Sequence, residues 1–420
     1  MFGYELPDTA LLIRKDGNCW FLATKKKCEF LKPATLQIPT KSPVKSITLL
    51  LRNKEDANAS NYDTLFKEAT SISKTDDETA VLGLILKERG TNSQSGGIVG
   101  PWEEKLTAAA DGDDATVSLV DVAHGLAFVT AIKDETELDL IKKSSVLSNK
   151  VMKHGYVKKM EEVIDSEKPV THEALAAYVD EILEDPSKIS LKVPKDDVGS
   201  CYFPIVQSGG TYDLKVSAQS TDANLKHDII LVSLGSRYRN YCSNIARTFF
   251  VDPPKKVSET YEVLMEMQEA CLAAMKPGNQ LKAVYQAAVT FLKERTGFEY
   301  LVGHLPKHLG FATGLDFRET SFSLNAKNPT QFKKGMVFCL SVGFQNLELS
   351  ETDLSSTPEK SAVSSVVASI GLLCPGTLNS GTATRLTHSF LSCCYCRSKS
   401  YRRMLFLFPT WSPLQRILLT

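Results

Sequence analysis

Short apolar runs separated by polar turns open the chain. Residues 9–14 and 19–24 are two such runs, and the residues between them include Asp16-Gly17, a pair typical of tight turns. The pattern predicts a β-hairpin at the start of a sheet. Further strand-like runs at residues 46–51, 79–86 and 116–122 alternate with helical stretches at residues 61–70 and 101–110. This alternation indicates an α/β domain over residues 1–130.

A long amphipathic stretch begins the next region. Apolar residues recur at helical spacing over residues 135–167, and a second helix is predicted over 171–185 with Thr171 as its N-cap. Strands and helices follow, with strands at 229–235, 248–252 and 336–342 and helices at 258–275 and 281–295. We interpret residues 131–348 as a second, larger domain.

The character of the chain changes after residue 348. No Asp or Glu follows Glu359, serine and threonine become frequent, and no periodicity is visible. We therefore expect residues 349–420 to be irregular, as a disordered or aberrantly encoded tail. At the other end, the first strand of the hairpin follows Met1 closely, which suggests that the start of this domain is truncated.

Charge and cysteine usage narrow the class of protein. The 49 basic and 49 acidic residues balance, so net charge alone attracts no nucleic acid. Ten cysteines without a disulfide framework suit a reducing compartment, and no apolar run reaches the ~18 residues of a membrane span. We expect a soluble intracellular protein that does not enter membranes.

One stretch carries most of the chemical information. Residues 231–249 (LVSLGSRYRNYCSNIARTF) resemble the strand pair of the creatinase and aminopeptidase P family, in which the pattern is V-D-x-G-x-x-x-x-x-Y-x-S-D-x-T-R-T-F. The two aspartates of that pattern bind a pair of divalent metal ions in the peptidases. In this chain they are replaced by Ser233 and Asn244.

Two later segments match the same family in the same order. Residues 310–319 (GFATGLDFRE) resemble the segment G-H-G-I-G-L-x-x-x-E, with Phe311 in place of the ligand histidine. Residues 334–343 (KGMVFCLSVG) resemble P-G-M-V-x-T-I-E-P-G, with Ser341 in place of the ligand glutamate. The resemblance implies a small creatinase-type N-terminal α/β domain followed by a pita-bread aminopeptidase-like domain of α+β class.

All four replacements remove groups that could bind a metal ion. Two neighbouring divalent cations need anionic oxygens, whereas serine and asparagine carry no charge and phenylalanine has no lone pair. We therefore predict that the metal site is lost at Ser233, Asn244, Phe311 and Ser341. The expected protein has no catalytic residue, no metal and no cofactor, and is not an enzyme.

Longer matches point to a narrower family. Residues 2–9 (FGYELPDT), 202–210 (YFPIVQSGG) and 343–348 (GFQNLE) resemble the large subunit of the FACT histone chaperone, and the last is most similar to plant members. The resemblance implies a non-catalytic module that binds core histones during transcription, replication and DNA repair, in the nucleus and on chromosomes. It implies an HMG-box partner subunit whose docking region lies downstream, and no sequence-specific binding of nucleic acid.

Other interpretations remain open at this stage. The chain could be a metal-dependent aminopeptidase or prolidase that uses Asp228, Asp316 or Glu319, or a purely structural spacer of a larger chaperone. The remaining motifs favour plain structural roles, namely loop histidines at 304 and 308, a turn at 209–210, a solvated strand edge at 25–27, and no zinc site at Cys374, His388, Cys393, Cys394 and Cys396.

Overall fold

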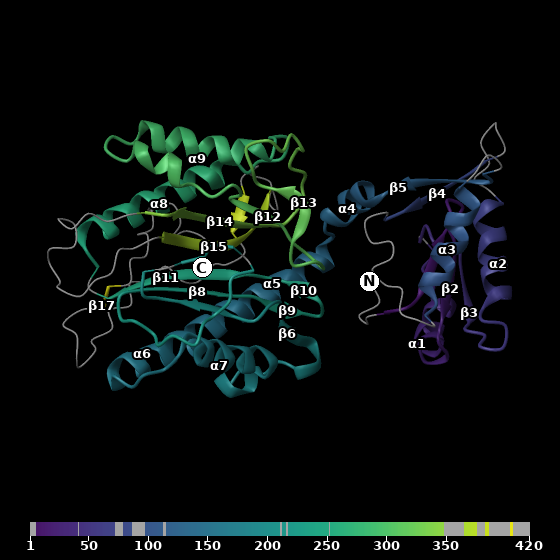
Figure 1. Ribbon diagram of the computed structural model, residues 1–420, viewed down its shortest axis with the longest axis horizontal. Helices are drawn as coiled ribbons and strands as arrows, with labels where there is room; N and C mark the ends of the chain where they lie inside the picture. The colour runs from purple at the N-terminus through teal and green to yellow at the C-terminus, as the bar shows by residue number, and fades with distance from the viewer. Residues whose placement is uncertain are drawn as a thin grey trace. The chain divides into compact units, whose positions relative to one another are not determined.

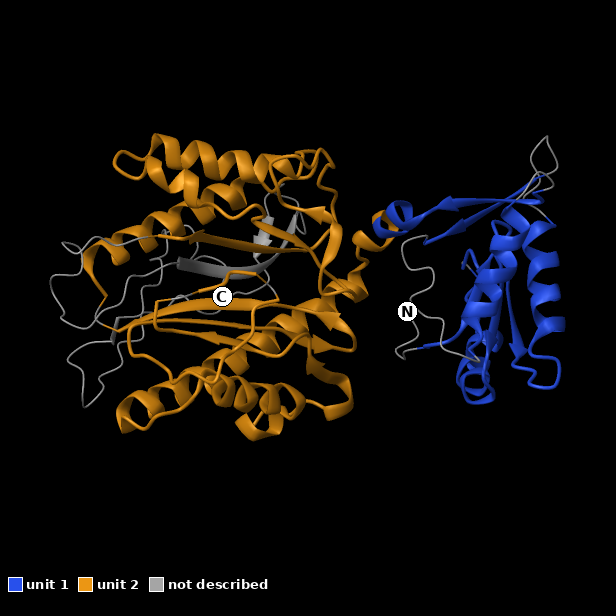
Figure 2. Ribbon diagram, in the orientation of Figure 1, with its two compact units in different colours: residues 1–127 blue, residues 128–420 orange. Residues whose placement is uncertain are grey.

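The computed structural model divides the chain into two compact units, residues 1–127 and 128–420 (Figure 2). It describes residues 6–40, 42–71, 79–85, 97–111, 115–210, 212–215, 217–251 and 253–347, and the backbone of three strands within 365–405. Among the described helices, none combines the length and apolar composition needed to cross a bilayer.

The first unit contains the predicted hairpin. β1 (Ala10–Ile13) pairs antiparallel with β2 (Asn18–Ala23), and the turn between them is closed by a hydrogen bond from the Gly17 amide to the Arg14 carbonyl at 3.0 Å. Gly17 has a φ of 91°, and a Cβ there would lie 2.2 Å from the Pro43 carbonyl oxygen. Only glycine fits this turn without a shift of the backbone.

Two parallel pairings complete the sheets of this unit. β3 (Ser46–Leu51) pairs with β2, and β4 (Ala80–Leu84) pairs with β5 (Val117–Asp121). The helices are α1 (Lys25–Leu36), α2 (Ala59–Thr70), α3 (Val99–Ala110) and α4 (Ala123–Ala131). The expectation of a solvated strand edge at 25–27 was wrong, because these lysines begin the helix α1, in which Lys25 and Lys26 are exposed.

An antiparallel sheet runs through the second unit, in the strand order β13-β12-β14-β15-β11-β8-β7. Its strands are β7 (Ile205–Gln207), β8 (Ile229–Leu234), β11 (Ile245–Val251), β12 (Gly310–Ala312), β13 (Glu319–Ser323), β14 (Phe338–Gln345) and β15 (Ser365–Pro375). A smaller sheet joins β6 (Val198–Ser200), β9 (Ser236–Tyr238) and β10 (Tyr241–Cys242).

Helices cover both sides of the large sheet, with α6 and α7 on one side and α8 and α9 on the other (Figure 1). The predicted long helix is interrupted by a π-helical segment, and Thr171 caps the next helix by accepting a hydrogen bond from the Ala174 amide at 3.1 Å. The helices are α5 (Glu135–Lys150), η2 (Val151–Val157), α6 (Lys158–Ser166), α7 (His172–Glu184), η3 (Pro186–Ile189), η4 (Lys195–Asp197), α8 (Lys255–Ala274), α9 (Lys282–Glu294) and η5 (Glu299–His304).

The main core lies between α5, η2, α6 and α7 and the strands β7, β8 and β11. All six residues of β8 are buried, which is the pattern of a strand covered on both faces. Ser233 is the only polar residue among them.

Three strands are described within residues 365–405, in the region where the sequence predicts an irregular tail. β15 pairs with β14 over eight residue pairs and also with β11, while β16 (Ala383–Arg385) and β17 (Met404–Leu405) pair with β15 and β11. The apolar edge of β14 is thereby paired, which satisfies its backbone groups. The rest of residues 349–420 lies outside the described residues, so for them the prediction stands untested.

Candidate functional site

Two of the replaced ligand positions lie on neighbouring strands. Ser233 is in β8, and Asn244 directly precedes β11, whose Ala246 is the partner of Ser233 in the ladder. Both side chains are buried, with exposed fractions of 7% and 1%. The strand pair therefore holds the two polar groups together within a largely apolar sheet.

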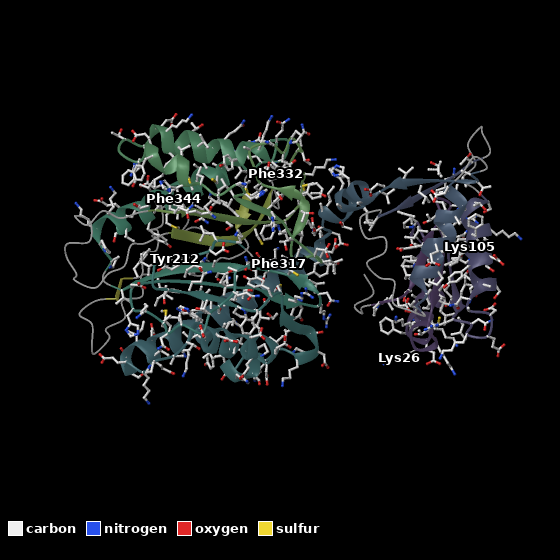
Figure 3. All side chains as sticks on the ribbon, viewed as in Figure 1. Lys26, Lys105, Tyr212, Phe317, Phe332 and Phe344 are labelled. Carbon is white, nitrogen blue, oxygen red and sulfur yellow. The ribbon has the colours of Figure 1, made fainter. Side chains whose placement is uncertain are left out.

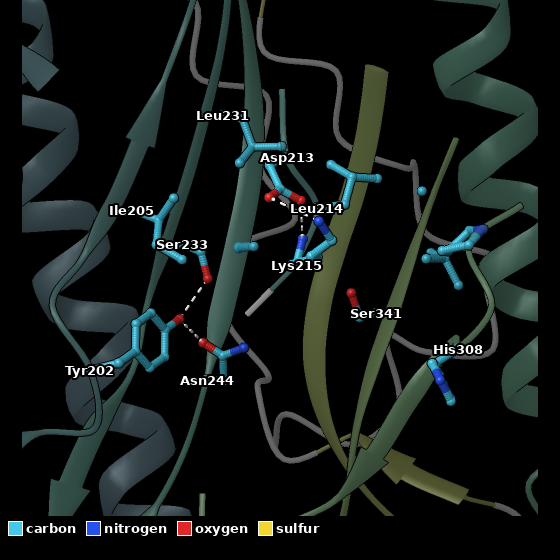
Figure 4. Close-up of a pocket in the computed structure, with 14 residues that line it drawn as sticks. Tyr202, Ile205, Asp213, Leu214, Lys215, Leu231, Ser233, Asn244, His308 and Ser341 are labelled. Atoms are coloured by element: carbon cyan, nitrogen blue, oxygen red, sulfur yellow. Dashed lines mark hydrogen bonds and ion pairs between the residues drawn. The ribbon is translucent and has the colours of Figure 1, made fainter. Parts of the chain in front are cut away.

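Ser341 reaches the same place from the other half of the sheet. It lies in β14, and β15 bridges the halves because Ile370 pairs with both Ala246 and Ser341. Ser233, Asn244 and Ser341 all line one pocket of about 60 Å³ (Figure 4). The structure thus brings together three of the four positions that the sequence singles out.

Phe311 lies apart from this pocket. On β12 it packs in a small apolar cluster with Ile141, Tyr241, Val337 and Cys339, and its ring meets that of Phe317 at 5.4 Å between centroids. A large aromatic side chain gains more free energy in this cluster than beside hydroxyl groups. Its position serves packing rather than ligand binding.

Tyr202 begins the matched segment 202–210, but its role in this site does not follow from the sequence. Its hydroxyl lies 2.6 Å from the Ser233 hydroxyl and donates a hydrogen bond to the Asn244 side-chain oxygen (Figure 4). Burial raises the pKa of Tyr202 well above its usual range, so the group stays protonated and able to donate. No local sequence signal marks this role, because Ser233 lies 31 positions and Asn244 lies 42 positions after Tyr202 in the sequence.

An aromatic contact holds the tyrosine in place. The ring of Tyr202 packs against Phe317, labelled in Figure 3, with 4.9 Å between ring centroids. Phe317 belongs to the segment after β12 and also contacts Phe311. The phenol is therefore fixed by packing on one side and by two hydrogen bonds at its tip.

Charged groups at the pocket come from loops. Asp213 forms an ion pair with Lys215 at 3.6 Å, and His308 lies on the opposite side of the pocket (Figure 4). Burial, together with Arg318 and Lys307, lowers the pKa of His308. Among the described residues that line the pocket, Asp213 supplies the one carboxylate.

The carboxylates considered for an alternative enzyme do not line this pocket. Glu319 forms a buried ion pair with Lys133 at 2.6 Å, and the Asp228 side chain accepts a hydrogen bond from the Gly209 amide at 3.3 Å. The backbone carbonyl of Asp316 accepts from the Gly314 amide at 3.0 Å. The carboxylates of Glu319 and Asp228 thus have structural partners within the fold.

The remaining motifs have ordinary surroundings. The His304 ring contacts the Gln345 carbonyl oxygen at 2.8 Å, and Gly209 and Gly210 have φ values of 87° and 98°, as a turn requires. The cysteines and the histidine considered for zinc, at 374, 388, 393, 394 and 396, have no described side chains.

The donor set does not fit a pair of hard cations. At the replaced positions and Tyr202, two hydroxyls, one amide and one phenol provide neutral oxygens, and the one carboxylate among the described lining residues, Asp213, is paired with Lys215. A pair of such ions requires several carboxylates to offset its charge. Over the part of the chain that the structure describes, no group of three or more His, Cys, Asp or Glu side chains could hold a metal ion. The hydroxyl, amide and phenol groups of the site can donate and accept hydrogen bonds.

Comparisons with known proteins show which family the chain belongs to. A model of the metallopeptidase family M24 matches residues 139–371, and one of the FACT complex subunit SPT16 N-terminal lobe domain matches residues 1–125. The solved N-terminal domain of SPT16 from chickpea (Cicer arietinum) is 34% identical, with a TM-score of 0.77 over 92% of this chain and 84% of that one. The chain belongs to the SPT16 family of FACT complex subunits. This confirms the family and fold expected from the sequence.

The chain matches only part of the longer SPT16 relatives. The rice protein (Oryza sativa) is 37% identical over 83% of this chain, and the Arabidopsis thaliana protein is 36% identical over 83%. The chain spans about a third of the length of these relatives, 32% in each case. An X-Pro aminopeptidase from Thermotoga maritima, 15% identical with a TM-score of 0.61 over 90% of this chain and 87% of that one, shares the fold.

Proposed function

We propose that this SPT16-type chain is a non-catalytic module that binds core histones. It would act within a FACT-type chaperone that reorganises nucleosomes during transcription, replication and DNA repair, in the nucleus and on chromosomes. Its partners would be core histones and, through regions outside this chain, an HMG-box subunit.

The hydrogen bonds of Tyr202 to Ser233 and Asn244 carry this proposal. In a peptidase of this fold, the two strand positions would hold carboxylates that face metal ions. Here a phenol joins the two strands by hydrogen bonds, so the side chains that would bind metal stabilise the sheet. A scaffold kept in shape without such chemistry is suited to recognition.

The pocket is too small to be the place where histones bind. At about 60 Å³ it is far below the ~300 Å³ at which ligand pockets usually begin, so a peptide side chain has little room there. We therefore propose that histones contact the exposed surface of the second unit rather than the pocket itself.

Calorimetric titration of the full chain at 150 mM salt with each of the two core histone complexes, the tetramer and the dimer, tests the proposal. We expect saturable binding of at least one of them with a defined stoichiometry. Lysozyme, a basic protein of unrelated shape, is the control for non-specific attraction, because histones adhere to many acidic surfaces. Equal binding of lysozyme, or no histone binding at this salt concentration, would contradict the proposal.

A further inference from the structure

One exposed helix face of the second unit carries a row of lysines. Over residues 142–159, which cover most of α5, all of η2 and the start of α6, the sequence has six lysines and one histidine but no Asp or Glu. Every exposed position in this range is lysine except Val146. We call Lys142, Lys150, Lys153 and Lys158 the lysine stripe.

The π-helical segment brings part of this stripe together. A π-helical turn holds more residues than an α-helical turn, so Val151–Val157 changes the rotation between the lysines before and after it. His154 lies within this segment. Its pKa is lowered by burial and by the positive charges of Lys153, Lys158 and Lys150. One imidazole thus lies in the field of three lysines.

Neighbouring acidic groups leave most of the stripe unneutralised. Lys143 pairs with Asp139 at 2.8 Å, and Lys159 pairs with Glu162 at 3.0 Å. By contrast, Lys142, Lys150 and Lys158 form no ion pair with any described residue. In a chain whose charges balance overall, this face is a local excess of positive charge.

We propose that the lysine stripe binds the phosphate backbone of double-stranded DNA without reading its sequence. From Lys142 to Lys158 an uninterrupted α-helix would advance about 24 Å at about 1.5 Å per residue. The π-helical segment shortens this length, which still passes several phosphates of a duplex. The inference goes beyond histone binding, because it assigns a second kind of partner to a different surface.

The composition of this face favours DNA over an acidic protein. Protein interfaces usually have an apolar core with aromatic anchors, and here Val146 is the one exposed apolar residue between Lys142 and Lys158. Lysine contacts to phosphate need no such core, since their free energy comes mainly from the release of counterions. Such contacts also carry no sequence information.

Fluorescence anisotropy of a labelled duplex of about 30 base pairs, long enough to span the stripe, tests the proposal. The full chain is compared with a stripe variant, Lys142→Gln with Lys150→Gln, Lys153→Gln and Lys158→Gln. A control variant removes the same charge from exposed lysines elsewhere, by Lys276→Gln, Lys293→Gln, Lys327→Gln and Lys334→Gln. A third variant replaces the stripe with four arginines. Thermal unfolding verifies that each variant folds.

We expect the stripe variant to bind DNA about tenfold more weakly or worse at 100 mM salt, with the slope of log K against log salt reduced by about three. The control and arginine variants should stay within about threefold of the native chain, and duplexes of different sequence should bind alike. Equal losses in the stripe and control variants would overturn the proposal. So would an absence of DNA binding by the native chain at 50 mM salt. Competition by poly-glutamate as effective as that by DNA would assign the stripe to an acidic protein instead.

Discussion

The hydroxyl of Tyr202 lies 2.6 Å from the hydroxyl of Ser233, at the strand position where a metallopeptidase of this fold would carry an aspartate. The same phenol bonds to Asn244, so one side chain connects both altered positions. The replacements are therefore coupled through a contact. A carboxylate at Ser233 would place a negative charge beside a buried phenol whose proton is already shared, at a cost in desolvation.

Replacing Tyr202 with phenylalanine should destabilise the protein. The ring packing against Phe317 is kept, but the Ser233 and Asn244 side chains lose a buried partner. We expect the free energy of unfolding, measured by urea denaturation, to fall by about 1–3 kcal/mol. Tyr178→Phe is the matched control and should change it by less than about 0.5 kcal/mol, since Tyr178 is 36% exposed. Similar values for the two variants would show that the Tyr202 hydrogen bonds contribute little.

The ion pair between Lys133 and Glu319 should be costly to break from one side only. Both side chains are buried, and burial raises the pKa of Glu319 while the attraction of Lys133 opposes this. Lys133→Met leaves a buried carboxylate without its cation and should cost about 3–5 kcal/mol in the free energy of unfolding.

A double variant separates the pair from simple packing loss. Lys133→Met with Glu319→Leu removes both charges, so it should be more stable than Lys133→Met alone. Urea denaturation of the native chain, both single variants and the double variant gives the coupling energy. Additive losses would contradict the claim that the charges stabilise one another.

Acid should weaken the fold partly through His172. Its ring nitrogens contact the Ser208 hydroxyl at 2.7 Å and the Thr221 hydroxyl at 3.1 Å, and burial lowers its pKa. The unfolded chain, in which the pKa of histidine is about 6.5, then binds more protons than the folded chain. This contribution to stability is present above about pH 6.5 and is lost as the pH falls through the lower pKa of the folded state.

The comparison of the native chain with His172→Gln measures this effect. From pH 7.5 to 5.5 the free energy of unfolding should decline more steeply for the native chain than for the variant. The other histidines are common to both proteins, so their effects cancel in the difference. Parallel curves would show that His172 does not contribute to acid sensitivity.

The sequence predicts the elements that carry a strong local pattern. The Asp16-Gly17 hairpin, the cap at Thr171 and the apolar run of β8 all follow from nearby residues. The helix α1 was missed because Lys25, Lys26 and Lys27 at its start, and Pro33 within it, weaken a helical pattern. Short strands such as β10, with two residues, exist through their pairing and leave no periodic signal.

The candidate site was predictable only as far as a family pattern reaches. Ser233, Asn244 and Ser341 were placed by matching motifs, and the structure brings them to one pocket. Phe311 matched the same pattern but lies in an apolar cluster, because the size of its ring favours packing. Tyr202 could not be assigned a role, since its partners are distant in sequence and its hydroxyl acts only in the folded chain.

Calorimetric titration with Mn²⁺ at pH 7.5 tests most directly the claim that this peptidase scaffold has lost its metal chemistry. Manganese is suitable because it prefers carboxylate oxygens and competes poorly for the cysteines of this chain. The account predicts no stoichiometric binding by the full chain and no release of N-terminal residues from X-Pro peptides. Binding of about two equivalents, together with hydrolysis that EDTA abolishes, would contradict it.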